Sequence, residues 1–364
     1  PGYVADASIA SQLAELGVIL LMFGVGLHFS LRDLMSVRHV AVPGALLRIL
    51  AGTAMGMAAA HYWGWSWGAG LVFGVGLSVA STVVLLRALI DLGSLTQTRS
   101  KIAIGWLIVE DLVTVIVLVL MPVLAEQLGG EPLHDEAGGV LRTVLFAIGK
   151  VSIFLIVMLV VGRRVLPWIF KGVVGVDSRE IFMLAVLASA LGVAYGSARL
   201  FDVSLALGAF VAGVVLSETA FGHQAEEEIY TIREAFSVLF FVSVGMLIDP
   251  AFLIEHPGRI LVVTFIIVVG KSVAAYFITL ALGQTSKTAL TVAIGLGQIG
   301  EFTFILATAA ISLKILPEEG RDLLLSGALL SITLNAILFR YLDRMQAWVD
   351  GHTRWGVQDT ATES

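Results

Sequence analysis

The chain has 364 residues, of which 58% are apolar and 14% are charged, with a formal net charge of −6 and a mean hydropathy of +0.95. Soluble domains carry about 25% charged residues, so this composition excludes an ordinary soluble domain. The absence of cysteine excludes disulfides, thiol catalysis and cysteine-ligated metal sites.

Apolar segments of membrane-spanning length recur along the whole chain, which predicts an all-α polytopic membrane protein. Hydrophobic periodicity indicates eleven helices within one transmembrane domain, residues 1–350, followed by a polar tail, 351–364. The expected helices are 11–29, 40–62, 68–90, 100–124, 140–165, 180–198, 203–219, 231–248, 258–282, 287–312 and 321–348.

Lysine and arginine are concentrated in alternate loops, which predicts the orientation of the chain. Cytoplasmic loops carry the excess of basic residues, so the C-terminus is expected in the cytoplasm and the Trp63, Trp65, Trp67 cluster at the outer interface. The basic loops hold Arg32, Arg38, Arg87, Arg99, Lys101, Arg163, Arg164, Lys171, Arg179, Arg233, Lys287, Arg340, Arg344 and Arg354. The other loops hold Arg142, Arg199, Arg259, Lys314 and Arg321.

The third and tenth predicted helices are interrupted near their middle by glycine and small polar residues. When Gly76 is aligned with Gly295, Thr82 and Glu301 occupy equivalent positions downstream. The expected topology places the two helices in opposite orientations. Such a pair is typical of an inverted-repeat transporter, with the binding site where the broken helices meet. Ordinary packing through glycine is the alternative.

Glu110 and Asp111 lie inside the apolar run from Ile102 to Met121, about ten residues from either end. At the helical rise this is roughly 15 Å, close to the midplane of a bilayer core of about 30 Å. A charge there costs at least ~2.5–3.5 kcal/mol, which indicates a functional site facing protein or water. The alternative is a structural carboxylate paired with a buried base.

Other polar residues are also expected at mid-depth. Lys271 needs an acidic partner, for which Glu110, Asp111 and Glu301 are the candidates. Ser78, Ser81, Thr82 and Gln298 join this group. Weaker signals are Arg48, Lys150 and Asn335, for which we expect snorkelling or packing in preference to a functional role. For the segment His223–Glu228 we expect a solvated loop, with a regulatory contact as the alternative.

A carboxylate in a low dielectric can hold a proton or a metal cation but not both, and this competition is the basis of proton/cation exchange. Interrupted helices add carbonyl oxygens and helix ends that coordinate a dehydrated cation. We expect Asp111 to be the ligand of the monovalent cation and the proton carrier, supported by Glu110, with Lys271 as the counter-charge. The residues expected to line or stabilise the crossover are Ser81, Thr82, Gln298 and Glu301.

Six segments form recognisable motifs, and with them the chain resembles a monovalent cation:proton antiporter of the Kef type, a glutathione-regulated potassium-efflux-like family. Kef-type proteins usually have Gln-Asp where this chain has Glu110-Asp111, so the chain is most similar to a Glu-Asp subgroup. The motifs are Leu20–Leu27, Ser81–Val84, Val109–Leu112, Leu205–Gly213, Phe240–Met246 and Gly297–Phe302.

The resemblance implies a sodium/proton-antiporter-like inverted repeat of thirteen helices, with two crossed discontinuous helices and a homodimer. Residues 40–124 and 258–348 would form a moving core, 11–29 and 180–248 a dimerisation part, and 140–165 a linker helix. The first two family helices and the cytosolic nucleotide-binding regulatory domain would be absent from this chain.

The sequence therefore predicts a secondary antiporter of the bacterial inner membrane that exchanges a monovalent cation, K⁺ in preference to Na⁺, for H⁺ by alternating access. A gated potassium-efflux channel of the same fold is the alternative, although the sequence has no TVGYG-like filter. An intramembrane aspartyl protease would use Glu301 as its second acid and leaves Lys271 unexplained. No motif of a soluble enzyme is present, so no enzymatic activity, cofactor other than the transported ions, or nucleic-acid partner is expected.

Overall fold

The computed structural model describes residues 7–28, 31–92, 97–131, 149–175 except 151, 178–246 except 202 and 204, and 250–352. Every secondary-structure element among these residues is a helix. Contacts divide the chain into two compact units, which are described separately here. The first unit comprises Pro1–Ser30 and His134–Leu247, and the second comprises Leu31–Leu133 and Ile248–Ser364.

Five of the described helical segments are long and apolar enough to cross a membrane, in agreement with the polytopic all-α class expected from the sequence. Shorter apolar helices accompany them. The five segments are Met35–Tyr62, Ser152–Val174, Arg179–Phe201, Pro257–Ala281 and Glu318–Arg340, and the shorter ones are Glu15–Leu27, Trp67–Ser78, Leu207–Ser217 and Phe302–Ser312.

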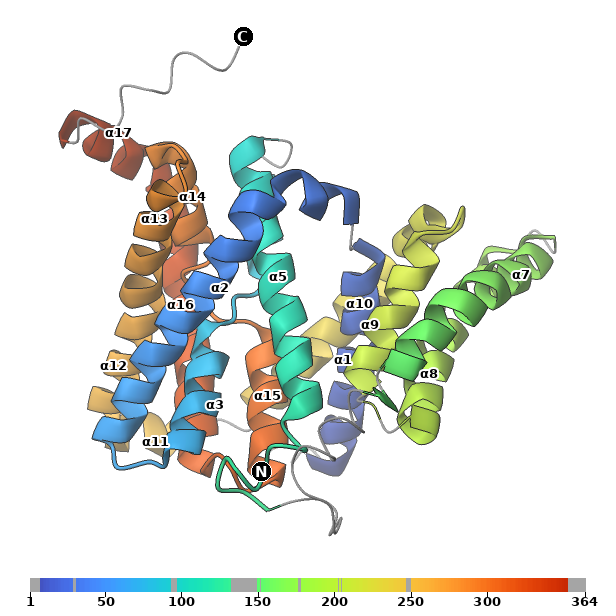
Figure 1. The fold of residues 1–364 in the computed structure, drawn as a ribbon, viewed down its shortest axis with the longest axis horizontal. Helices are drawn as coiled ribbons and strands as arrows, with labels where there is room; N and C mark the ends of the chain where they lie inside the picture. Colours follow the sequence, from blue (N-terminus) through green and yellow to red (C-terminus); the bar gives the residue numbers. More distant parts are fainter. Residues whose placement is uncertain are drawn as a thin grey trace, which may run out of the picture. The chain divides into compact units, whose positions relative to one another are not determined.

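In the first unit, α1 packs against α9 and α10, while α8 packs against α7 and α9 (Figure 1). A π-helical turn, η1, leads directly into α7. The elements are α1 (Ala7–His28), η1 (Met158–Gly162), α7 (Arg163–Val174), α8 (Arg179–Phe201), α9 (Leu205–Ser217) and α10 (Gly222–Gly245).

The contact between α1 and α9 depends on two glycines that face each other's backbone. A Cβ on Gly213 would collide with the carbonyl oxygen of Phe23, and a Cβ on Gly26 would collide with the carbonyl oxygen of Phe210. Small residues let helix backbones approach closely, which is the main source of packing energy between helices in lipid. The two motifs around Gly26 and Gly213 therefore serve as one packing surface.

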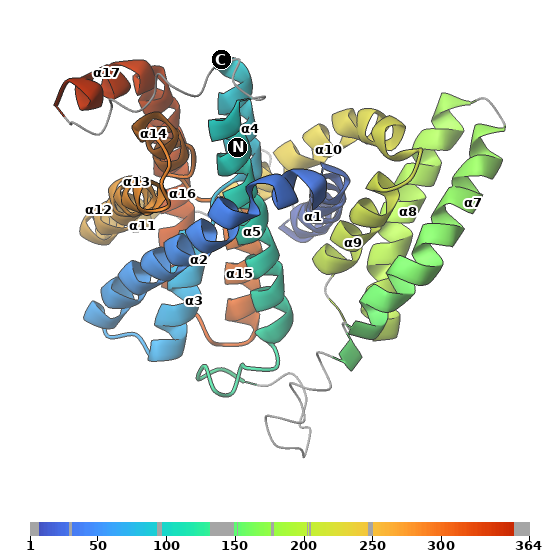
Figure 2. The ribbon, with the colours of Figure 1, turned by 45° about the horizontal axis from the view of Figure 1, so that its top comes forward.

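The second unit contains the remaining helices (Figure 2), in which α2 packs against α3 and α5, and α14 packs against α5 and α13. A second π-helical turn, η2, joins α12 to α13 without a break. The elements are α2 (Leu31–Tyr62), α3 (Trp67–Ser78), α4 (Thr82–Asp91), α5 (Thr98–Leu120), α11 (Pro250–Glu255), α12 (Pro257–Phe265), η2 (Ile266–Gly270), α13 (Lys271–Ala281), α14 (Ser286–Gly295), α15 (Glu301–Ser312), α16 (Glu318–Arg340) and α17 (Leu342–His352).

Two helices of the second unit are interrupted, as the sequence predicts. α3 ends at Ser78 and α4 begins at Thr82, and α14 ends at Gly295 and α15 begins at Glu301. Thr82 and Glu301 are thus equivalent, because each is the first residue of a second half-helix. Figure 1 shows α3 beside α15, in line with their direct packing.

Both interrupted helices also start in the same way, with a hydroxyl cap. Ser66 Oγ accepts a hydrogen bond from the Ala69 amide at 3.1 Å, and Thr285 Oγ1 accepts one from the Thr288 amide at 3.2 Å. Such caps satisfy backbone donors that have no partner within the helix. The repeated order of cap, half-helix, break and half-helix matches the inverted repeat of a sodium/proton-antiporter-like fold.

Aromatic and charged residues gather where α2 ends and α12 and α16 begin. The rings of Trp63 and Trp65 lie 5.8 Å apart, and the Arg259 guanidinium lies 5.5 Å from the centroid of the Trp63 ring. Arg259 also forms an ion pair with Glu319. The expected position of this cluster at the outer interface stays a prediction.

The acidic segment His223–Glu228 is helical, so the expectation of a loop is wrong, although the side chains of His223 and Glu227 are exposed to solvent as expected. It forms the first turns of α10, which begins at Gly222 rather than near residue 231. Within it, His223 and Glu227 lie one turn apart with side chains at 3.4 Å. Glutamate is a good helix former, and a search for apolar residues alone does not detect a polar helix end.

Other boundaries also differ from the sequence prediction. The helix expected at 140–165 continues to Val174. In the sequence the basic pair Arg163 and Arg164 indicates the end of the helix, but both side chains are exposed on α7, and long basic side chains can reach water from within a helix. Its expected start, up to residue 148, lies outside the described residues. The helix expected over 321–348 is divided at residue 341 into α16 and α17, and the short α11 was not expected.

The two units overlap with the expected parts of the transporter. The second unit contains 40–124 and 258–348, the expected moving core, and the first contains 11–29 and 180–247, all but the last residue of the expected dimerisation part. The assignment of movement to one unit and of dimer contacts to the other stays a prediction.

The close approach of α1 and α9 is testable by substitution. Gly213→Ala should lower the free energy of unfolding by about 1–3 kcal/mol, the usual cost of overpacking, because the new methyl group collides with the Phe23 carbonyl. Thermal unfolding in detergent measures the effect. The control is Gly192→Ala on α8, where a Cβ meets nothing within 4 Å, and where alanine should stabilise the helix by roughly 0.5–1 kcal/mol. Equal melting temperatures for the two variants would contradict this account.

Candidate cation-binding site

The two interrupted helices cross where their backbones are extended. A Cβ on Gly300 would lie 2.6 Å from Ser81 Cα and 2.7 Å from the Ala80 carbonyl oxygen, so glycine is needed for this approach. Gln298 joins the two breaks: its Oε1 accepts from the Ser81 amide at 2.9 Å and its Nε2 donates to the Ser81 carbonyl at 3.1 Å. The crossing expected from the sequence is thus present in the second unit.

Four charged side chains are buried around this crossing. Among the described side chains, Arg48, Glu110, Asp111 and Lys271 are the only ones of Asp, Glu, Lys or Arg that are buried, and none is more than 4% exposed. Two are formally positive and two formally negative. Charges at this depth are tolerated only when they are paired or bound to backbone dipoles, so their partners determine what each can do.

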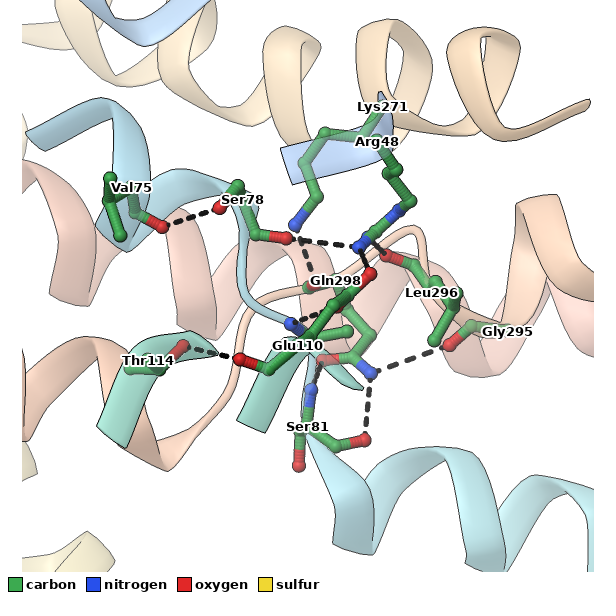
Figure 3. A network of polar contacts seen from close by, with 11 residues as sticks. Arg48, Val75, Ser78, Ser81, Glu110, Thr114, Lys271, Gly295, Leu296 and Gln298 are labelled. Carbon is green, nitrogen blue, oxygen red and sulfur yellow. Dashed lines mark hydrogen bonds and ion pairs between the residues drawn. The ribbon is translucent and has the colours of Figure 1, made fainter. Parts of the chain in front are cut away.

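Arg48 on α2 forms an ion pair with Glu110 on α5, both fully buried (Figure 3). Glu110 is held further by the Ala80 amide, which donates to its Oε2 at 3.3 Å. Thr114, one turn later, donates to the Glu110 carbonyl at 2.8 Å. Glu110 is therefore bound both to a base and to the break between α3 and α4.

Besides the carbonyls of Ser81 and Val75, which accept from Gln298 and Ser78, six backbone carbonyls near the two breaks accept hydrogen bonds from five buried side chains. The last carbonyls of a helix have no partner within it, and a bilayer core offers no water to replace them. These contacts let both helices stop inside the unit. They are Thr303 to Gly76 at 2.7 Å, Arg48 to Ser78 at 3.0 Å and to Leu296, Asn335 to Ile294 at 2.6 Å, Gln298 to Gly295 at 3.4 Å, and Lys271 to Gln298 at 3.0 Å.

These six carbonyls lie at the C-terminal ends of helices, whereas Asp111, which is on α5, lies beside the N-terminal end of α4. Thr82, the first residue of α4, donates from its Oγ1 to Asp111 Oδ2 at 3.0 Å. The Ser81 hydroxyl caps the same helix by accepting from the Val84 amide at 3.3 Å. Helix N-termini carry partial positive charge and favour an anion. The structure thus brings Ser81, Thr82 and Asp111 together as the sequence predicts.

Lys271 at the start of α13 is fully buried, and its ammonium donates to the carbonyl of Gln298. It lies close enough to Arg48 and Glu110 to interact with both electrostatically. In the described part of the chain its hydrogen bond is to a carbonyl, whereas the base paired with Glu110 is Arg48. The role of Lys271 as counter-charge stays a prediction, with a helix-end carbonyl as its observed neighbour.

The remaining predicted residues differ in what the structure describes. Gln298 is buried with both ends of its amide bonded to backbone groups. Glu301 begins α15, but its side chain lies outside the described residues. The described residues contain no group of three His, Cys, Asp or Glu side chains suited to a metal ion. The oxygens gathered at Asp111 and Thr82 are hard ligands of the kind that alkali cations prefer.

Arg48 is the residue that sequence reasoning missed. It was expected to snorkel or pack, but it is fully buried and bound to three groups. The available signal was its depth within the predicted helix 40–62, the same criterion that identified Lys271. Asn335 was likewise expected only to pack, and it instead caps a carbonyl at the end of α14.

Comparison with known proteins agrees with this arrangement. Residues 2–342 match the family model described as sodium/hydrogen exchanger, transmembrane. The chain belongs to this family. Its members are transporters, so the expectation that the chain is not an enzyme fits the family.

The names of two similar proteins are consistent with the Kef-type branch of this family. YbaL of Escherichia coli (strain K12), provisionally named a cation/proton antiporter, is 52% identical over 352 residues, covering 95% of this chain and 62% of that protein. K(+) efflux antiporter 4 of Arabidopsis thaliana is 33% identical over 366 residues, covering 99% of this chain and 60% of that protein. This chain therefore spans about three-fifths of the length of these two relatives.

A solved structure supports the fold. The sodium proton antiporter MjNhaP1 from Methanocaldococcus jannaschii superposes with a TM-score of 0.68 over 94% of this chain and 87% of that one, at 16% sequence identity. At this identity the match shows a common fold and leaves the transported ion open.

The crossing can be tested through Gly300. Gly300→Ala should lower the free energy of unfolding by about 1–3 kcal/mol, because its methyl group would press on the backbone of Ala80 and Ser81. Gly76→Ala is the control in the other broken helix, since a Cβ there lies 3.4 Å from its nearest neighbour, Leu324 Cδ1. Thermal unfolding in detergent compares them, and a Gly76→Ala variant that is the less stable of the two would refute the described crossing.

Proposed function

We propose that this chain is the membrane part of a secondary antiporter that exchanges a monovalent cation for H⁺ by alternating access. The observation that carries the proposal is the buried Asp111 carboxylate at the N-terminus of α4, beside the Thr82 hydroxyl. Family membership and the names of the relatives support the same class of transport. K⁺ is the favoured cation because the plant relatives are named K⁺ efflux antiporters, with Na⁺ as the second choice.

The mechanism follows from the competition at one carboxylate. A cation that reaches Asp111 loses part of its water, and the Asp111 and Thr82 oxygens replace it. A proton on the same carboxylate removes the negative charge and releases the cation. When the site faces one side and then the other, each passage carries either the cation or the proton, which couples their gradients.

The other site residues are assigned by their contacts. Glu110 supports the site from its ion pair with Arg48, Ser81 shapes the start of α4, and Gln298 holds the crossing. Lys271 acts as a counter-charge near the end of α14. Glu301 is assigned to the start of α15 by its equivalence to Thr82.

We further propose a multi-pass location in the bacterial inner membrane, with the C-terminus in the cytoplasm, and assembly as a homodimer. The alternating pattern of lysine and arginine supports the orientation. The relatives exceed this chain in length, and a cytosolic nucleotide-binding regulatory domain of the Kef type is the partner we propose for this membrane part.

Vesicles containing the purified protein and an internal pH dye test the exchange. Addition of K⁺, Na⁺, Rb⁺ or Li⁺ should change the internal pH, with K⁺ most effective. Asp111→Asn should abolish this response because it keeps the size of the side chain and removes the titratable charge. Asp322→Asn is the matched control, as Asp322 is half-buried beside Arg321 in α16. Near-normal exchange by Asp111→Asn would refute the mechanism.

Cysteine labelling tests the orientation, and the absence of native cysteine makes it unambiguous. A cysteine at Tyr62, which is 87% exposed at the end of α2, should react with an impermeant reagent in intact cells. A cysteine at Lys171, exposed near the end of α7, should be protected until the membrane is opened. The reverse pattern would overturn the proposed topology.

A further inference from the structure

Arg48 stands apart from the other side chains at the crossing. It lies on α2, outside both interrupted helices, and yet it donates to the last residue of α3, Ser78, and to Leu296 directly after α14. The same guanidinium pairs with Glu110 on α5. One side chain therefore contacts both broken helices and the helix that carries Asp111 (Figure 3).

The local structure is arranged for this contact. Gly52 lies one turn after Arg48, and a Cβ there would be 2.9 Å from Ser78 Cβ, so the glycine lets the end of α3 approach α2. The guanidinium has five donors in a fixed plane, which can serve acceptors in several directions at once. A lysine ammonium is a single point of charge and cannot occupy the same two carbonyl positions and the carboxylate together.

We propose that Arg48 is a positioning residue for ion exchange: it holds the ends of α3 and α14 together, and so fixes the start of α4, where Thr82 meets Asp111. Only the predicted effect of Arg48 on transport rests on the proposed function. The structural part of the inference is that Arg48 keeps the backbone of the two breaks ordered, and this can be measured without transport.

The competing explanation is that Arg48 only balances the charge of Glu110. The two explanations differ in the double variant Arg48→Gln/Glu110→Gln. This variant removes one positive and one negative charge, so the formal charge of the buried group is unchanged. Charge balance is restored, but the glutamine cannot supply the bonds to Ser78 and Leu296.

Amide hydrogen exchange of the purified protein measures how well the backbone amides of the two breaks, residues 79–81 and 296–300, are protected. The amides of Arg48→Gln, Arg48→Lys and the double variant should each exchange at least about tenfold faster there than those of the unchanged protein, because the bonds to two carbonyls are lost. For the double variant the segment 296–300 decides, because Glu110 itself accepts from the Ala80 amide. The control is Arg259→Gln, which breaks another ion pair of the same unit, with Glu319, and should leave these segments protected.

In vesicles, the same Arg48 variants should raise the apparent KM for the cation roughly tenfold or more, since a displaced ligand binds poorly. Arg259→Gln should leave it unchanged. If Arg48→Gln is not recovered as a folded protein, Arg48→Lys, which keeps the charge, provides both measurements. Wild-type protection together with a wild-type KM in either Arg48→Lys or the double variant would overturn the proposal.

The two proposals can fail separately. If the unchanged protein moves no protons in response to cations, the antiport proposal is wrong, and hydrogen exchange still decides whether Arg48 holds the crossing. If cation/proton exchange is normal and the amides of both breaks stay protected without Arg48, the positioning role is wrong and the antiport proposal stands.

Discussion

Two helices of the second unit end inside an apolar layer, and the structure depends on satisfying the carbonyl groups that these ends expose. An unpaired carbonyl in hydrocarbon costs several kcal/mol. Five buried side chains supply the missing donors, and Arg48 supplies donors to both ends. The crossing is therefore stabilised by side chains from helices that surround it rather than by the broken helices alone.

The buried charges follow the polarity of the helix ends. Arg48 and Lys271 lie where α3 and α14 end, which is the negative side of a helix dipole. Asp111 lies where α4 begins, which is the positive side. In this arrangement a buried charge does not require its own oppositely charged partner, because a helix end of opposite polarity stabilises it. The proposed competition between proton and cation at Asp111 would take place at such a helix end.

The two neighbouring carboxylates have different surroundings for a simple geometric reason. Adjacent positions on a helix point about 100° apart, so Glu110 meets Arg48 while Asp111 meets Thr82. The Glu-Asp sequence thus combines a carboxylate held by a base with a carboxylate beside a hydroxyl group. This division is the structural ground for assigning the exchange to Asp111 and a supporting role to Glu110.

The sequence by itself determined the class of protein, the two interruptions and the burial of Glu110, Asp111 and Lys271, because apolar length and glycine placement are local properties. It did not reveal the partner of Glu110, since Arg48 lies 62 residues away in the chain, or the contact of Arg48 with Leu296, which spans 248 residues. Sequence reasoning left the partner of Lys271 open among three acids. Among the described residues its hydrogen bond is to the Gln298 carbonyl, and Glu110 lies within electrostatic range. Periodicity specifies which residues are buried, whereas only the packing of helices decides which buried polar groups meet.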